Sequence, residues 1–583
     1  MTDTKPAADS TRAKPRGGLL RQSSFTSMAA AAAIASGLLL DATIAARYGA
    51  GRTSDAFFVG ARIPLGLVAV VTAAANQALV PTFSTWFTRK GEQDTWPLIS
   101  KIVTATLVLG LAVAAIGGLA ARPLMAATAP GLHGAQLDAA AEVARLMFFV
   151  VPLVALAEVL RAVLNARFMF VAPAAMNVVM NGVAAGAILY SGGDHINLVG
   201  IAYVLGAGAQ LVFMAVTSAR RGFRFRPSFR WRDPDIVATG KLSLRPLASA
   251  SLNPAARIGE QLFTSFLPAG SITVINYGYR LISAIGGSVF FRSVIVALLP
   301  RLTEATAEED EERIGKITEQ GLTLMLLLSL PMTAFLAVLA GPAAVVVFKR
   351  GNLNRSDAVL LGTALAIYAG SLVGSAVQRA LLAPFFASLN TLVPWRNTLY
   401  GVMANLQMLP VLLLVVGLHS RYAALAVPVS YSVAQYVNVV HAWYCLRRLQ
   451  HVKVRARAAF RMATASALTA AALYAMSSAL ELPSTRNRLE LTVRGAMCAV
   501  VGAAVLILTL AFTAAVGRRR EQRRRRVQSM RQSGPSRKTP ELHPEASPPH
   551  PAPPSDLSEP DEALQPELLL DVPVLADGPD PFP

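Results

Sequence analysis

The sequence predicts an all-α polytopic membrane protein, and its composition and an internal repeat lead to this fold class. Of its 583 residues, 54% are hydrophobic and only 15% are charged, whereas about 25% of the residues of an ordinary soluble chain are charged. The apolar stretches reach about 20 residues, the length that a helix needs to cross the hydrocarbon core. Arg62-Ile63-Pro64 leads to Pro81, and about 219 residues later Arg280-Leu281-Ile282 leads to Pro300. A duplicated membrane unit with a buried cation is typical of a transporter.

About 14 transmembrane helices account for these stretches in chain order. We expect them near residues 25–46, 54–86, 98–121, 140–165, 168–190, 197–219, 243–267, 271–300, 320–347, 357–383, 391–416, 421–446, 459–480 and 489–516. The first is long, follows a polar arm and lacks a convincing cleavage site, so we expect it to remain as a span. The only two cysteines, Cys445 and Cys498, lie in apolar stretches. This argues against a disulfide framework or a cysteine-based metal site.

Basic residues fall mainly in the connections after even-numbered helices, and this predicts the orientation. Residues 220–232 follow the sixth span and 447–457 follow the twelfth, while the basic residues within 349–355 are an exception. Because connections rich in Lys and Arg stay in the cytoplasm, we expect both termini to be cytoplasmic. The formal net charge of +20 comes largely from these loops and from 518–526. It therefore indicates membrane orientation and not nucleic-acid binding.

The chain divides into six parts by composition and by the repeat. They are a cytoplasmic N-terminal arm (1–24), a first lobe of helices 1–6 (25–219), a basic cytoplasmic linker (220–242), a second lobe of helices 7–12 (243–446), helices 13–14 (447–516) and a tail (517–583). The connections after odd-numbered helices are short, which leaves no room for an outer catalytic domain and argues against an enzyme. The acidic, proline-rich end of the tail predicts a disordered tether. A partner-binding segment around Leu568-Leu569-Leu570 is the alternative.

Several ordered motifs give the chain a family resemblance. Asp55-Ala56-Phe57-Phe58-Val59 is followed by Arg62-Ile63-Pro64 and Gln77-Ala78-Leu79-Val80-Pro81. Asn276-Tyr277-Gly278-Tyr279-Arg280-Leu281 and Leu298-Leu299-Pro300-Arg301-Leu302 come later in the same order. These segments resemble those of the MurJ/MviN lipid II flippases, which belong to the multidrug/oligosaccharidyl-lipid/polysaccharide exporter superfamily. The resemblance covers roughly residues 25 to 450.

The resemblance implies both a fold and a function. Helices 1–6 and 7–12 would form two lobes around a central cavity, and helices 13–14 would add a groove for a lipid tail. The repeat supports the two lobes independently, because six helices per unit give both lobes the same orientation. The implied function is to flip an undecaprenyl-pyrophosphate-linked cell-wall precursor from the inner to the outer leaflet of the bacterial inner membrane.

Two departures from the family pattern bear on the cargo. Leu40-Asp41 stands where the family usually carries Arg-Asp, and Leu65-Gly66-Leu67-Val68-Ala69 stands where it carries Asn-Leu-Leu-Arg-Arg. Part of the family's phosphate-binding charge is therefore missing. The leading hypothesis is a flippase for a lipid II-like precursor, and the alternative is a flippase or exporter of another lipid-linked glycan, such as an exopolysaccharide intermediate. A non-transporting membrane scaffold for cell-envelope enzymes is a third hypothesis.

Arginines inside the predicted spans are the candidates for substrate binding. A charged side chain at the bilayer centre costs about 2.5–3.5 kcal/mol, and a guanidinium can bond two phosphate oxygens at once. The candidates are Arg62, Arg257, Arg280, Arg292 and Arg379. Arg62 and Arg280 rank first because matched repeat positions would bring them to opposite walls of one cavity. Structural ion pairs are the alternative, namely Arg62 with Asp55 and Arg257 with Glu260.

Acidic residues inside or next to the spans are candidates for gating or ion coupling. Asp41 and Asp55 flank the first outward turn, and Glu260 lies in the seventh span. Helix capping is the alternative for Asp55, since Ser54-Asp55 begins a helix. Glu158 and Arg161 have i,i+3 spacing and are predicted to form a structural pair.

No cofactor is expected. No cluster of His and acidic residues has metal-ligand spacing, and no glycine-rich phosphate loop is followed by Lys, so ATP hydrolysis is not expected. Isolated His441 is more simply structural than a proton relay. A coupling ion or the membrane potential, at about 2.3 kcal/mol per charge per 100 mV, would supply the energy. The expected partners are a polyprenyl-pyrophosphate-linked saccharide, membrane lipids and, through the tail, cell-envelope proteins, with no nucleic acid.

Overall fold

The computed structural model describes residues 16–191, 195–229, 233–286, 289–348, 353–449, 457–480, 490–505 and 507–508, and its regular elements in these ranges are helices. The predicted all-α class is confirmed. The first half contains α1 (Arg16–Tyr48), α2 (Arg52–Ala74), the π-helix η1 (Ala75–Leu79), α3 (Val80–Arg89), α4 (Gly91–Leu119), α5 (Ala121–Thr128), α6 (Ala135–Phe148), α7 (Val150–Ala166), α8 (Val171–Tyr190) and α9 (Asn197–Ala219). The second half contains α10 (Pro234–Thr264), α11 (Ser271–Gly286), α12 (Val289–Ala307), α13 (Glu311–Phe348), α14 (Arg355–Ala387), α15 (Leu392–Val416), the 3₁₀-helix η2 (Arg421–Leu425), α16 (Ala426–Leu449) and α17 (Arg457–Ala479).

Ten helical segments of the described residues are long and apolar enough to cross a membrane. They correspond in order to the predicted spans one to six and nine to twelve. The predicted seventh, eighth, thirteenth and fourteenth spans are not among them, and the fourteenth extends beyond the described residues. The seventh corresponds to α10, which carries two internal prolines and several polar residues, and the eighth corresponds to two elements, α11 and α12. The fourteen predicted spans are therefore not all reproduced by length and apolarity.

Two helices begin earlier in the chain than the predicted spans. Helix α1 begins at Arg16, so its N-terminal turns occupy part of the predicted arm. Helix α10 begins at Pro234, inside the predicted linker, because Asp233 caps it by accepting a hydrogen bond from the amide of Asp235. Aspartate at the cap followed by proline in the first turn is a strong helix start.

Helices α2, η1 and α3 form one continuous segment, Arg52–Arg89, of 38 residues. At 1.5 Å per residue such a segment is about 57 Å long, so its two ends lie on opposite sides of the helical bundle. Pro81 has no amide hydrogen to continue the regular ladder. The π-helix ends at Leu79, two residues before Pro81, and the amide of Val80 bonds the carbonyl of Ala75.

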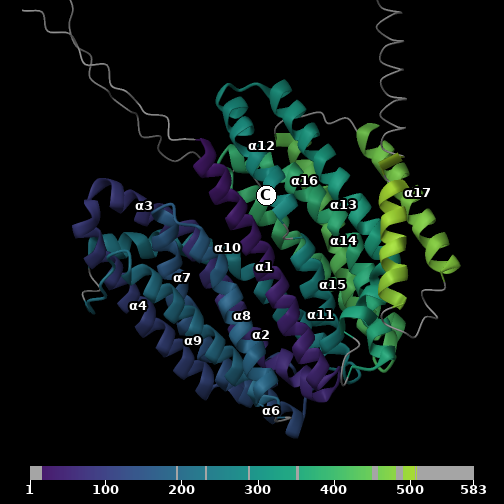
Figure 1. The fold of residues 1–583 in the computed structure, drawn as a ribbon, viewed down its shortest axis with the longest axis horizontal. Helices are drawn as coiled ribbons and strands as arrows, with labels where there is room; N and C mark the ends of the chain where they lie inside the picture. Colours follow the sequence, from purple (N-terminus) through teal and green to yellow (C-terminus); the bar gives the residue numbers. More distant parts are fainter. Residues whose placement is uncertain are drawn as a thin grey trace, which may run out of the picture. The chain divides into compact units, whose positions relative to one another are not determined.

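The structure divides into two units, Met1–Arg518 and Arg519–Pro583. The second unit, with the predicted tail segment around Leu568, lies outside the described residues. In the first unit, α1 packs on α8, α8 on α9 and α2 on α6, while α13 packs on α14 and both α14 and α15 pack on α16. Figure 1 shows these as two groups of helices. Helix α10 packs on α2 of the first group and on α15 of the second, so it joins them, and the arrangement agrees with the predicted two-lobe fold class.

Candidate functional site

Three arginines from three packed helices form a cluster where the two helix groups meet. Arg62 of α2 interacts electrostatically with Arg257 of α10 and Arg280 of α11, and both α10 and α11 pack on α2. Two buried carboxylates, Asp41 and Glu260, accompany them. Three guanidiniums and two carboxylates leave the ionised cluster with one positive charge. We call these five residues the arginine cluster.

Arg280 is paired across the two helix groups. Its guanidinium donates to the carboxylate of Asp41 on α1, which is 239 residues away in sequence. It also lies 3.5 Å from the Tyr203 hydroxyl and 5.4 Å from the centre of the Phe58 ring. The Arg280 side chain remains 28% exposed, against 6% for Asp41. The structure thus joins a predicted substrate contact to a predicted gating residue.

Arg257 is paired within its own helix. Its Nη1 donates to Oε2 of Glu260 at 2.5 Å, as the i,i+3 spacing predicts. Its guanidinium carbon lies 3.0 Å from the centre of the Tyr279 ring. The other oxygen of Glu260 accepts from Nδ2 of Asn405 at 2.6 Å. Arg257 is therefore held in place by a carboxylate and an aromatic face.

Arg62 has a neutral partner. Its Nε donates to Oε1 of Gln261 at 3.0 Å, and Nε2 of Gln261 lies 3.3 Å from the Thr128 hydroxyl. Within the described residues no carboxylate forms an ion pair with Arg62. The predicted pairing with Asp55 is wrong, because Asp55 faces the start of α11. Arg62 is therefore the cation that accounts for the excess charge of the cluster.

Asp55 caps a helix other than its own. One oxygen accepts from the amide of Gly270 at 2.6 Å, and the other accepts from the amide and the hydroxyl of Thr273 at 2.8 and 2.6 Å. A carboxylate at a helix N-terminus also interacts favourably with the helix dipole. Gly270 has a φ of +87°, and a Cβ there would lie 2.8 Å from the carbonyl oxygen of Ala50. The contact therefore requires glycine, and it ties α2 to the turn before α11.

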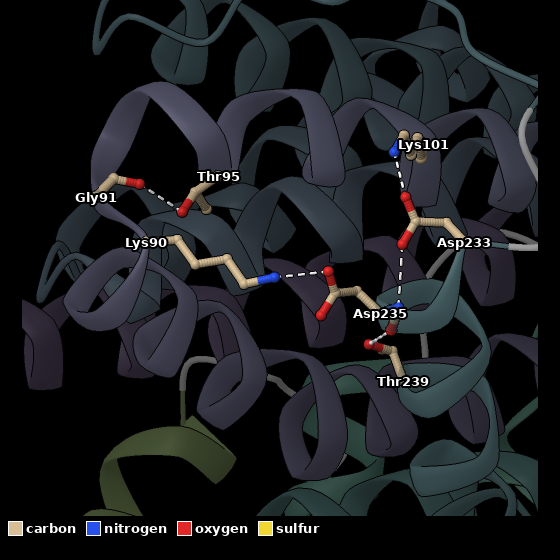
Figure 2. Close-up of polar contacts among 7 residues, drawn as sticks. All are labelled: Lys90, Gly91, Thr95, Lys101, Asp233, Asp235 and Thr239. Carbon is tan, nitrogen blue, oxygen red and sulfur yellow. Dashed lines mark hydrogen bonds and ion pairs between the residues drawn. The ribbon is translucent and has the colours of Figure 1, made fainter.

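The opposite end of the Arg52–Arg89 segment is held by ion pairs, which Figure 2 shows. Nζ of Lys90 lies 2.6 Å from Oδ2 of Asp235, and Lys101 of α4 donates to Asp233. The hydrogen bond from Lys101 lowers the pKa of the Asp233 carboxyl below its usual value. The first turn of α10 is thereby fixed to α3 and α4. Sequence reasoning missed this contact, although Asp233-Pro234 is a recognisable helix start.

The remaining predicted residues lie outside the arginine cluster. Arg379 donates to the carbonyl of Gly286 at 2.8 Å, and Arg292 lies in α12 with its side chain outside the described part. Glu158 accepts from Nε of Arg161 at 2.5 Å and from Thr72 at 3.1 Å, so the predicted i,i+3 pair is present. His441 contacts Asn397 at 3.0 Å, which agrees with a structural role.

Comparisons with known proteins give consistent results. The family model described as "Lipid II flippase MurJ" matches residues 44–489. A probable lipid II flippase MurJ from Buchnera aphidicola subsp. Acyrthosiphon pisum is 24% identical over 69% of this chain and 78% of that protein. A probable lipid II flippase MurJ from Rhizobium meliloti is 26% identical over 81% of this chain and 89% of that protein. A lipid II flippase MurJ from Burkholderia cenocepacia is 26% identical over 61% of this chain and 71% of that protein.

Solved structures share the fold. A structure titled "Lipid II flippase MurJ, inward closed conformation" has a TM-score of 0.70 and 16% identity, covering 84% of this chain and 98% of that one. An inward-facing multidrug resistance transporter of the MATE family, from the MOP superfamily, has a TM-score of 0.60 and 15% identity, covering 71% of this chain and 94% of that one.

Proposed function

The chain belongs to the lipid II flippase MurJ family, and from that premise we propose that it flips lipid II, a polyprenyl-pyrophosphate-linked saccharide, between the two leaflets of a membrane. The chain is a transporter and not an enzyme. The ten apolar helical segments make it a multi-span membrane protein. The head group would pass between the two helix groups, while the polyprenyl tail remains in lipid.

The observation that carries this proposal is the charge of the arginine cluster. A pyrophosphate that links a lipid to a sugar is anionic, and arginine binds such oxygens through its planar fork. Arg257 and Arg280 each have a carboxylate partner, whereas Arg62 has the neutral Gln261. We assign Arg62 as the main pyrophosphate contact. Arg280, which stays 28% exposed, would be the second contact.

Asp55 would act as a gate at one end of the transport path. Its three hydrogen bonds join α2 to α11, and these helices belong to different groups. Release of the head group at that end requires these bonds to break. The basic connections support placing this end outside and the Lys90 end in the cytoplasm, with both termini cytoplasmic in a bacterial inner membrane. A coupling ion or the membrane potential would supply the energy.

Charge reversal at Arg62 tests the proposal. We expect Arg62→Glu to slow flipping of fluorescent lipid II in proteoliposomes roughly tenfold or more, because the cluster would lose its excess positive charge. The readout is the fraction of label that an impermeant quencher reaches with time. Arg122→Glu is the matched control, since Arg122 lies 61% exposed at the surface, paired with Asp138. Normal flipping by Arg62→Glu would reject the assignment. A non-transporting scaffold predicts that even wild type flips no more lipid II than protein-free liposomes do.

Another lipid-linked glycan is a second candidate cargo. Leu40, which replaces an arginine usual in the family, is buried in the apolar core. The site therefore has fewer cations for a pyrophosphate than the family pattern offers. Depleting the chain in its cells and identifying the lipid-linked saccharide that accumulates on the inner leaflet would distinguish the two cargoes. Accumulation of lipid II supports the first, and accumulation of a different glycan lipid supports the second.

A further inference from the structure

An apolar cavity lies between α10 and the helices α2, α4 and α7 of the first group. Its volume is about 350 Å³, many times the roughly 30 Å³ that one water occupies. Of the residues that line it, none is charged and none belongs to the arginine cluster. The polar side chains of the lining are Thr106, Thr239 and Ser243. The cavity is therefore a separate site with an almost entirely apolar wall.

The cavity is elongated along the helices. Ile102 and Val113 of α4 both line it, and so do Ile236 and Leu247 of α10. Each pair spans about 16 Å of helix at 1.5 Å per residue. A space that follows two helices for this length suits an extended hydrocarbon chain.

Water finds few partners in this cavity. The Thr239 hydroxyl donates to the carbonyl of Asp235 at 2.7 Å, and the Ser243 hydroxyl donates to the carbonyl of Thr239 at 2.8 Å. Two of the three polar side chains of the wall are thus already bonded within α10. Apolar cavities stay dry, and protein interiors contain few voids larger than a water. The occupant that fits is apolar.

The cavity reaches the surface of the helix bundle along α4. Leu109 lines the cavity and is 68% exposed. Lipid tails are as apolar as leucine, so hydrocarbon is the medium that meets such a side chain inside a span. Ala75 and Leu79 of η1 form another part of the wall, and π-helical turns frequently lie at functional sites. The cavity is therefore placed to admit a chain from the bilayer.

One end of the cavity lies beside a basic loop. Ile102 lines this end, two residues after Ser100, and the Ser100 hydroxyl accepts a bond from the amide of Arg226 at 3.4 Å. The loop after α9 therefore packs on α4 at this level. Residues 220–226 of the loop include four exposed arginines. Basic residues at the membrane surface attract the phosphates of lipid head groups.

We propose that this cavity holds one acyl chain of a membrane phospholipid whose phosphate lies at the arginines of 220–226. This lipid is not the transported one, and the inference does not rest on the proposed function. Helix α10 forms one wall and packs on both helix groups. The bound chain thus fills a space between the first group and the helix that joins the two groups.

Photolabelling in nanodiscs tests this site. The probe is phosphatidylglycerol with a diazirine at the end of one acyl chain, diluted into phosphatidylcholine around the full chain. We expect peptide mapping to find label at the far part of the wall, near Val113 and Leu247. A Cβ at Gly240, which also lines the cavity, meets no atom within 4 Å. Gly240→Phe should therefore fill the cavity without a clash and lower this labelling roughly tenfold or more.

Matched variants separate the chain site from general effects. A Cβ at Gly186 of α8 likewise meets no atom within 4 Å, so Gly186→Phe makes the same change elsewhere and should leave the labelling intact. Arg224→Glu should lower it roughly fivefold, because the phosphate loses a contact. Arg122→Glu, which changes an exposed arginine paired with Asp138, should not.

Thermal unfolding checks that each variant is folded, and Gly240→Leu is the smaller substitute if phenylalanine prevents folding. Wild type that carries label on its exposed faces alone would overturn the proposal. Label on the cavity wall that persists in a folded Gly240 variant would overturn it too. Displacement of the wall label by undecaprenyl phosphate, but not by unlabelled phosphatidylglycerol, would overturn it in favour of a polyprenyl tail.

Discussion

The two ends of the Arg52–Arg89 segment are held by different kinds of contact. At one end, Asp55 is 2% exposed and accepts three hydrogen bonds from the start of α11. At the other end, Lys90 and Asp235 form an ion pair with side chains 37% and 36% exposed. A buried carboxylate that loses its donors is costly to leave unpaired, whereas exposed ion pairs contribute little and are screened by salt. The first contact therefore suits a discrete gate, and the second suits an anchor for α10.

Removing the Asp55 carboxylate should have the largest effect, because it weakens the buried contact between α2 and α11. We expect Asp55→Ala to destabilise the closed end by about 2–4 kcal/mol, because it removes a helix cap and leaves two amides without acceptors. The measurement is labelling of an Ala56→Cys reporter, 1% exposed in the structure, with a membrane-impermeant maleimide. The native cysteines are buried. Labelling should rise.

Ser54→Ala is the control for this prediction. The Ser54 hydroxyl lies 2.9 Å from the Thr273 hydroxyl, and it also bonds the amide and the carbonyl of Gly51 at 3.0 and 3.1 Å. Its loss removes neutral hydrogen bonds worth about 1 kcal/mol each, of which only the Thr273 contact joins α2 to α11. Labelling should rise much less than with Asp55→Ala. Equal labelling of wild type and Asp55→Ala would show that Asp55 does not hold this end closed.

Exchanging the charges at the other end should have a smaller effect. Lys90→Asp or Asp235→Lys alone should lower stability by about 0.2–1 kcal/mol, and the double exchange should restore it, because the pair is exposed. Thermal unfolding in low salt measures the change. In about 1 M salt, where the Debye length falls to about 3 Å, the single variants should approach wild type. A difference that salt does not reduce would contradict the description of this end as a screened anchor.

Acidification should have the smallest effect, and it acts on the contact between Asp233 and Lys101. The pKa of Asp233 lies below its usual value of 3.8 because Lys101 bonds the carboxylate. The unfolded chain therefore takes up this proton at higher pH than the folded chain, and the stabilisation is complete above about pH 4 and is lost as pH falls through the lower folded pKa. Asp233→Asn should remove this acid-dependent part of the unfolding profile and lower the stability by the same amount at every pH from 5 to 8. An effect of Asp233→Asn that varies between pH 5 and 8 would contradict it.

Local features of the site could be predicted from the sequence. The Arg257–Glu260 and Glu158–Arg161 pairs follow from i,i+3 spacing, because residues three apart share a helix face. The matched repeat positions of Arg62 and Arg280 led to the expectation of two equivalent contacts. The structure makes them unequal, since Gln261 bonds one and Asp41 pairs with the other. A repeat determines the place of a residue in its helix but not the side chain that another helix presents to it.

The sequence by itself determined the membrane class, the order of most spans and the family, because hydropathy and motifs are read along the chain. Only the tertiary structure decided the partners of Asp41, Asp55 and Lys101, which lie 239, up to 218 and 132 residues away. The physical reason is that a charged side chain in an apolar helix bundle bonds to the donor or acceptor that helix packing places within bonding distance. That choice depends on how the helices meet, and it leaves Arg62 without a carboxylate of its own among the described residues.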